Sequence, residues 1–184
     1  MNDRVSSRSS SDEPSPAEVV GLLGEKPISG LRRAVDMQIF DFGDRVPIVD
    51  HRGRNRTIGE YRLHVQSPWR FLRAGVPFVT YHDLWQPTTE APDAPFDPNL
   101  GSETLRDELL ERFVAESTAD ERTVENVSMS GAGGLYLRFR GGTALEVDAE
   151  DPQSEREAWR LLLPDGAHAV MSGSRFAMQR PPPS

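Results

Sequence analysis

The chain has 184 residues, of which 21 are Lys or Arg and 29 are Asp or Glu, and its formal net charge is -8. This length fits one domain, or two small lobes that share one core, and the net negative charge repels phosphate backbones, so nucleic acid is a poor default partner. The absence of cysteine excludes disulfides and thiolate metal ligands and fits a reducing cytoplasm. No stretch approaches about 18 consecutive apolar residues and the N-terminus lacks the apolar run of a signal peptide, so we predict no membrane partner and a cytoplasmic location.

The N-terminal segment is predicted to be a tail followed by a short helix. Residues 1–14 are Ser-rich and polar, which predicts disorder. Ser15 then stands where an N-terminal cap is expected, Pro16 suits the first helical position, and Glu18 completes a capping box.

Residues 35–39 alternate apolar and polar side chains, the pattern of a half-buried strand. We expect Val35, Met37 and Ile39 on the inward side. Two phenylalanines then break the alternation, which predicts a bulge or a strand end near Asp41 and a connection over residues 41–57.

The segment YRLHVQSPWR, residues 61–70, predicts a second half-buried strand. Its inward side carries Tyr61, Leu63 and Val65, and continues as Trp69 and Phe71 beyond a proline that belongs at an edge or bulge. A turn at residues 74–75 then returns the chain as a partner strand.

The middle of the chain predicts a connection and a helix. Residues 86–101 are Pro-rich and extended. Residues 102–117 place leucine, phenylalanine and valine on one stripe at helical spacing, with Ser102 as the expected cap.

The last third predicts a β-meander with a strand at 124–130 and two hairpins. With a three-residue loop over 141–143, Phe139 faces Leu145, and a two-residue loop would break the apolar pairing. In the second hairpin the loop is 164–166, which pairs Leu161 with Ala169.

These elements predict an α+β fold: a mostly antiparallel, curved sheet with a C-terminal β-meander and one main helix packed on it. We expect a single domain over 15–178, in which lobes 31–85 and 102–178 are joined by the connection 86–101, with disordered tails over 1–14 and 179–184.

Four segments, LHVQSPWR, DLWQP, ALEVD and WRLLLPDGAHAV, occur in this order along the chain. They resemble a family of small uncharacterised bacterial proteins, mostly from GC-rich lineages, over about residues 31–172. Members often have cysteine where this chain has Ser67, so a thiol role is not available here. Some such small acidic proteins look like immunity or accessory partners of other bacterial proteins, which implies protein binding by analogy.

The polar row between the inward residues of the second strand, Arg62, His64 and Gln66, with Arg70 further on, is the first candidate site. An arginine fork and a histidine form a platform for an anion or polar ligand. The alternative is a solvated strand face, which antiparallel sheets commonly have.

A second candidate is His82, close to Trp85. A catalytic base there needs a carboxylate from elsewhere, such as Glu60 or Asp50, and no nucleophile motif accompanies it. The alternative is a loop that Trp85 holds by packing on the core.

A third and weaker candidate is the basic stretch with Arg52, Arg54 and Arg56, which could contact phosphate. A lone basic loop on an acidic chain also suits an intramolecular partner for Asp or Glu. The four histidines show no metal-ligand spacing, so we predict no metal and no cofactor.

We therefore predict a non-enzymatic protein-interaction module, an immunity-like or accessory protein that binds another protein through an acidic surface or a sheet edge. The alternative is a small-ligand-binding or hydrolytic domain. In that case Arg62, His64, Gln66 and His82 should converge in one polar cleft.

Overall fold

The fold is α+β, with two antiparallel sheets that face each other and a C-terminal strand meander. The computed structural model describes residues 13–50, 52–89, 95–100 and 103–181. The predicted N-terminal tail therefore lies largely outside the described residues, as do parts of the Pro-rich connection and the last three residues. Within the described residues no helix is long and apolar enough to cross a membrane.

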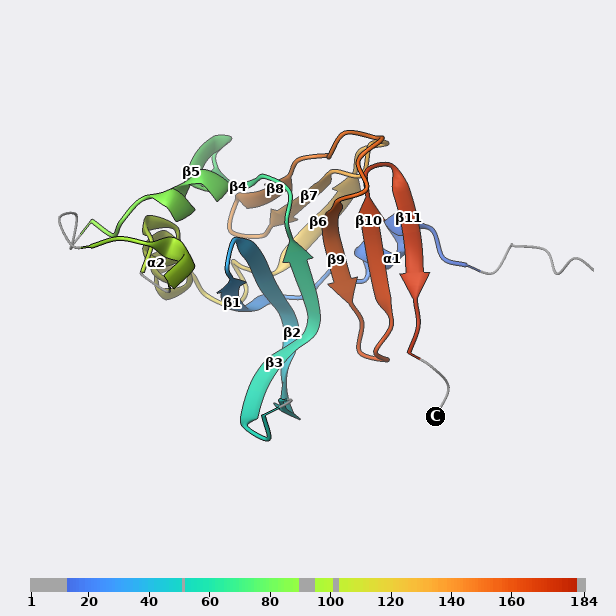
Figure 1. The fold of residues 1–184 in the computed structure, drawn as a ribbon, viewed down its shortest axis with the longest axis horizontal. Coiled ribbons are helices and arrows are strands. Elements are labelled where there is room, and N and C mark those ends of the chain that lie inside the picture. Colours follow the sequence, from blue (N-terminus) through green and yellow to red (C-terminus); the bar gives the residue numbers. More distant parts are fainter. Residues whose placement is uncertain (1–12, 51, 90–94, 101–102, 182–184) are drawn as a thin grey trace, which may run out of the picture.

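The first sheet has six strands in the order β1-β2-β3-β9-β10-β11. Its strands are β1 (Ile28–Ala34), β2 (Met37–Val49), β3 (Asn55–Val65), β9 (Glu157–Leu162), β10 (His168–Ser172) and β11 (Arg175–Gln179). Figure 1 shows the far ends of β2 and β3 projecting away from the sheets as a curved arm.

The second sheet has five strands in the order β5-β4-β8-β7-β6. Its strands are β4 (Trp69–Arg73), β5 (Val76–Thr80), β6 (Val124–Met129), β7 (Leu135–Phe139) and β8 (Thr143–Val147). Each sheet therefore combines strands from before the Pro-rich connection with strands from after it.

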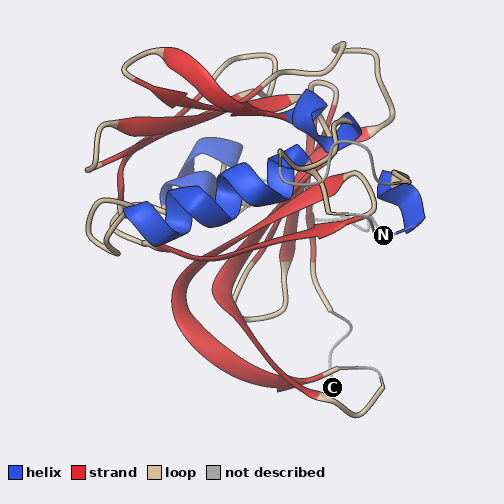
Figure 2. Cartoon of the chain, turned by 90° about the vertical axis from the view of Figure 1, so that its left-hand side faces the viewer, coloured by secondary structure: helices blue, strands red, loops and turns tan. Residues whose placement is uncertain are grey.

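Two α-helices and two 3-10 turns complete the fold: α1 (Pro16–Gly21), η1 (Tyr81–Trp85), η2 (Pro98–Leu100) and α2 (Leu105–Glu116). Figure 2 shows α2 lying across the open side between the two sheets. On another side an isolated bridge between Pro27 and Thr123 joins the N-terminal end of β1 to the start of β6.

The core fills the space between the sheets. Phe40 lies edge-on to Trp69 and Phe71, with ring centroids 5.4 and 5.9 Å apart, and Phe71 contacts Phe113 of α2 at 5.1 Å. Each of these rings is at most 3% exposed. The inward side predicted for the second strand is confirmed, since Leu63 and Val65 are fully buried.

The chain passes from one sheet to the other between β3 and β4, at Ser67 and Pro68. The amides of Gln66 and Ser67 both donate to the Ala158 carbonyl of β9, at 2.9 and 3.0 Å. The predicted break at Pro68 is thus a crossing between sheets, because proline has no amide for either ladder.

The predicted strand over residues 35–39 is wrong in both extent and phase. Val35 sits in a hairpin turn with φ 59° and is 60% exposed. The β-strand resumes at Met37, where Gln38 is 1% exposed and Ile39 lies on the opposite side. The inner face accepts Gln38 because its amide nitrogen donates to the Arg32 carbonyl at 2.9 Å.

The predicted connection over 41–57 is also wrong, because β2 and β3 remain paired as far as Val49 and Asn55. The register shift lies between Phe42 and Arg45, close to the predicted bulge.

In the helix predicted over 102–117, the cap is Thr104: its Oγ1 accepts from the Asp107 amide at 3.2 Å, and α2 begins at the next residue.

The two predicted C-terminal hairpins have different outcomes. Leu161 pairs with Ala169 as predicted. In the other hairpin Leu137 pairs with Leu145, so the loop is 140–142 and the predicted register is wrong by two residues. A shift of two keeps the same side chains inward, so the apolar pattern does not distinguish these registers. Strand β11 was not predicted.

Candidate anion-binding face

The side of the six-stranded sheet that points away from the five-stranded sheet, here called the outer face, gathers charged side chains into two rows. Strand pairing fixes the members of each row. The first row runs Gly30, Asp41, Arg62, Leu162, His168 and Gln179, and the second runs Arg32, Ile39, His64, Arg160, Val170 and Ala177.

Two carboxylates neutralise two of the three arginines in these rows. Arg32 donates through Nη2 to both oxygens of Asp41, at 2.9 and 3.0 Å. Arg160 donates through Nη2 and Nε to Glu157, at 2.6 and 3.1 Å. Each of these pairs is a charge-assisted contact that neutralises the guanidinium, while Arg32 Nε stays buried with no hydrogen-bond partner among the described residues.

Arg62, at the centre of the first row, has no such partner. Its guanidinium makes no hydrogen bond or ion pair within the described part of the chain, and Asp41 attracts it only at longer range. The side chain is half-buried between β2 and β9. This burial lowers the pKa of Arg62 from its ordinary value, with the Asp41 charge opposing the shift. The group nevertheless stays charged, so five N–H donors face the surface unpaired.

His64 lies two residues along β3 from Arg62, on the same face, and is also unsatisfied. Its Nε2 atom is buried and has no hydrogen-bond partner among the described residues. Burial, and after it the Arg62 charge, lowers the pKa of His64 to about 4. The ring is therefore neutral at pH 7 and adds no positive charge in the unbound protein.

His168 is neutral for a similar reason. Arg160 Nη1 lies 3.0 Å from His168 Nδ1, and since the guanidinium can only donate, Nδ1 accepts and the ring proton sits on Nε2. Burial and then Arg160 lower the pKa of His168. Because both histidines are neutral, the arginines supply the fixed positive charges of the outer face.

Gln66 belongs to the same surface, one residue beyond the end of β3. Its side-chain amide donates to Glu157 Oε1 at 3.2 Å. The structure thus brings together three predicted site residues, Arg62, His64 and Gln66, and adds Arg160 and His168 from β9 and β10.

The other predicted candidates lie elsewhere. Arg70 is on β4 of the five-stranded sheet and pairs with Glu146 and Asp148, at 2.9 and 3.1 Å. His82 is exposed on η1, with its ring edge-on to Tyr81 at 5.6 Å. The predicted convergence of His82 with His64 is therefore not what the structure shows.

Trp85 and the basic stretch also differ from the outer face. Trp85 is 48% exposed, which does not fit the alternative in which its ring packs on the core. Arg54 and Arg56 both pair with Asp50 at 2.9 Å, at the tip of the β2–β3 arm. The Arg52 amide also donates to Asp50, at 2.9 Å. This stretch is held by an intramolecular carboxylate, the alternative that the sequence left open.

No set of three or more His, Asp or Glu side chains within the described ranges is arranged to hold a metal ion. Comparison with protein-family models finds none that matches the chain. Neither the curated proteins nor the solved structures that were compared match it.

Proposed function

We propose that this protein is a non-enzymatic binding protein whose outer face recognises the carboxylates of an acidic segment in a partner protein. The observation that carries the proposal is the unpaired, half-buried guanidinium of Arg62. A partly desolvated arginine fork without a carboxylate is costly to hold, and an external carboxylate supplies the missing acceptors. In this proposal the protein acts as an accessory or immunity-type protein, and its partner is another protein of the cytoplasm.

The extent of the face favours a peptide segment over a small anion. The charged side chains run from Arg32 on β1 to His168 on β10, across four gaps between neighbouring strands. At about 4.8 Å per gap this is about 19 Å, the length of roughly six extended residues. An acidic segment of that length meets Arg32, Arg62 and Arg160 in succession.

The net charge of the chain does not oppose this assignment. Charges more than about 10 Å away are largely screened at 0.1 M salt, so the local excess of arginine over carboxylate governs a bound segment. Extended phosphate backbones are a different case, because a long polyanion also meets the acidic remainder of the surface.

The test is fluorescence anisotropy with a labelled decaglutamate peptide at pH 7 and about 0.1 M salt, where the acidic remainder of the surface is screened. We expect saturable binding that weakens as salt is added. Arg62→Gln should reduce the affinity about 10- to 100-fold, the effect of losing a hydrogen bond between charged groups. Arg54→Gln removes the same charge from the arm and should leave affinity within about twofold, because Arg54 already pairs with Asp50.

Two results would contradict the proposal. One is equal loss of affinity in Arg62→Gln and Arg54→Gln, which would show a non-specific charge effect. The other is tighter binding of a single-stranded oligonucleotide of equal charge, which would assign the face to nucleic acid.

A further inference from the structure

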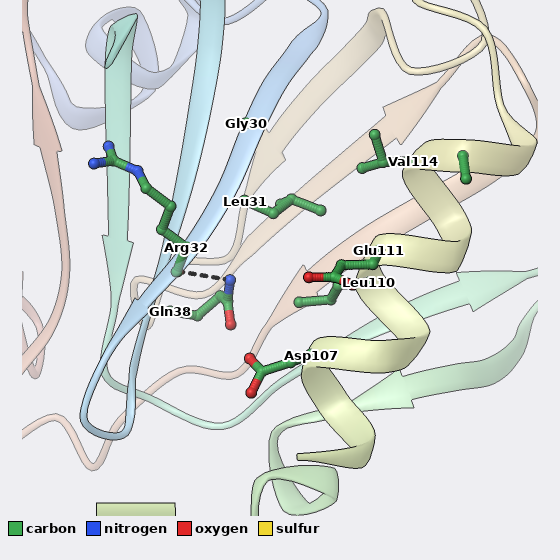
Figure 3. A pocket seen from close by; sticks show the side chains of 9 residues that line it. Gly30, Leu31, Arg32, Gln38, Asp107, Leu110, Glu111 and Val114 are labelled. Atoms are coloured by element: carbon green, nitrogen blue, oxygen red, sulfur yellow. Dashed lines mark hydrogen bonds between the residues drawn. The ribbon is translucent and has the colours of Figure 1, made fainter. Parts of the chain in front are cut away.

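A cleft separates α2 from the edge strand β1, away from the outer face (Figure 3). Its volume is about 300 Å³, the lower end of the range for small-molecule sites. Apolar side chains from both elements form its walls: Leu31, Leu110, Val114 and Ala115. Arg32 contributes to the lining but its side chain points away from α2 in Figure 3.

Gln38 forms the polar part of this cleft. The residue is 1% exposed, and Oε1 is buried without a hydrogen-bond partner in the part of the chain that the structure describes. The orientation of the amide is settled by the other end, because Nε2 lies 2.9 Å from the Arg32 carbonyl, which can only accept. Oε1 is thus the atom directed toward the cleft, where it lacks a donor (Figure 3).

Two carboxylates stand on the α2 side of the cleft. Asp107 pairs with Arg33 at 2.9 Å and also caps its helix. Glu111 is exposed and has no ion-pair partner among the residues that the structure describes. The cleft therefore combines an apolar wall, a buried acceptor and one uncompensated negative charge.

We propose that this cleft binds a small molecule with an apolar body and a protonated amine. The body packs on Leu31, Leu110 and Val114, and the head group donates a hydrogen bond to Gln38 Oε1. Glu111 favours a cationic head over a neutral one, and a carboxylate head meets only acceptors. The proposal does not depend on the outer face, which lies on the other side of the six-stranded sheet and selects anions.

The test uses three probes that share one body: 4-phenylbutylamine, 4-phenylbutanol and 4-phenylbutyrate. Binding is followed by amide chemical-shift changes of the full-length protein at pH 7. We expect the amine to shift β1 and α2 resonances saturably, the alcohol to bind more weakly at the same resonances, and the carboxylate not to bind.

Two variants with matched controls locate the site. Ala115→Phe fills the cleft and should weaken amine binding at least tenfold, whereas Arg112→Phe, on the same helix but outside the lining, should not. Glu111→Gln should weaken the amine about threefold and leave the alcohol unchanged, with Glu116→Gln as the control. Both glutamates are exposed, so these variants test the charge without disturbing the core.

The proposal is overturned if none of the three probes gives saturable shifts at millimolar concentration, if the carboxylate binds as well as the amine, or if Ala115→Phe binds the amine like the wild type.

Discussion

The two faces of the six-stranded sheet are formed by alternate residues of the same strands, but their side chains are stabilised in different ways. On the inner face, Leu63 is fully buried against the opposing sheet and has every contact that a core residue needs. On the outer face, its neighbours Arg62 and His64 are half-buried and keep unsatisfied donors or acceptors. Packing accounts for the apolar side chains of the inner face, whereas the outer face presents a half-buried guanidinium that a bound carboxylate can pair.

The largest expected effect on the free energy of unfolding comes from a substitution on the inner face. Leu63→Ala removes a fully buried side chain from the centre of the core and should destabilise the protein by about 2–5 kcal/mol. His64→Ala, one residue along the same strand, should lower the stability at pH 7 by less than half as much. Urea denaturation of both variants measures the difference. Equal losses would mean that the outer face is as tightly packed as the core.

A second variant tests Arg106, a buried charge on the core side of α2. Arg106 is fully buried, and within the described residues its Nε and Nη2 atoms have no hydrogen-bond partner while Nη1 donates to the Asp36 carbonyl at 3.3 Å. The guanidinium lies 5.8 Å from the Trp69 ring, and burial lowers the pKa of Arg106 to about 10.

Because a buried charge without a carboxylate is expensive, Arg106→Met should raise the free energy of unfolding by about 1–3 kcal/mol. Arg106→Ala leaves a cavity instead and should lower it. A loss of stability in the methionine variant would show that Arg106 makes net favourable contacts inside the protein, unlike Arg62.

The third effect is a pH dependence set by His64. The ring has an ordinary pKa of about 6.5 when unfolded and about 4 when folded, so between these values the unfolded chain binds the extra proton. The contribution of His64 to the free energy of unfolding should therefore be fully present above pH 6.5 and be lost as the pH drops toward 4. After allowance for partial exposure, we expect about 1–2 kcal/mol from this residue.

Denaturation midpoints measured between pH 4 and 7.5 test this sign. His64→Gln should lose less stability than the wild type over that interval, and His82→Gln, which changes an exposed ring, should behave as the wild type does. A steeper loss in His64→Gln would contradict the account.

The smallest expected effect on stability belongs to Arg62→Gln. Because Arg62 makes no hydrogen bond within the described residues, its loss should change the free energy of unfolding by no more than about 0.5 kcal/mol. The same variant should lose peptide binding, so it separates recognition from folding. A loss of several kcal/mol would instead give Arg62 a structural role.

The sequence predicts the faces of this sheet better than the arrangement of its strands. The inward side of 61–65 follows from strand alternation, and the hairpin with its loop at 164–166 follows from Pro164 and Gly166. In the hairpin ending at Phe139, alternation allows two registers. In the structure the loop is 140–142, and the Arg140 amide donates to the carbonyl of Thr123, next to β6, at 3.0 Å.

The candidate site could be predicted only in part, because alternation shows which side of a strand a residue lies on but not which strands are neighbours. Arg62, His64 and Gln66 are visible in one strand, but Arg160 and His168 join them because β3 pairs with β9, about 95 residues later. Strand alternation in WRLLLPDGAHAV places Arg160 and His168 on one side of the hairpin. It does not show that β3 is the strand that pairs with β9. Gln38 was missed because its burial depends on one backbone carbonyl. The resemblance to small bacterial proteins stays a prediction.

The central claim, that the outer face binds carboxylates, is tested most directly at His64. The measurement is the protonation state of its ring at pH 5.5, read from imidazole nitrogen shifts with and without the decaglutamate peptide. In the free protein the pKa of His64 is about 4, so we predict a neutral ring at this pH. A neighbouring anion stabilises the imidazolium, so we predict that the ring becomes substantially protonated in the complex. The His82 ring should be unaffected by the peptide. An identical His64 signal in both samples, at saturating peptide, would contradict the claim.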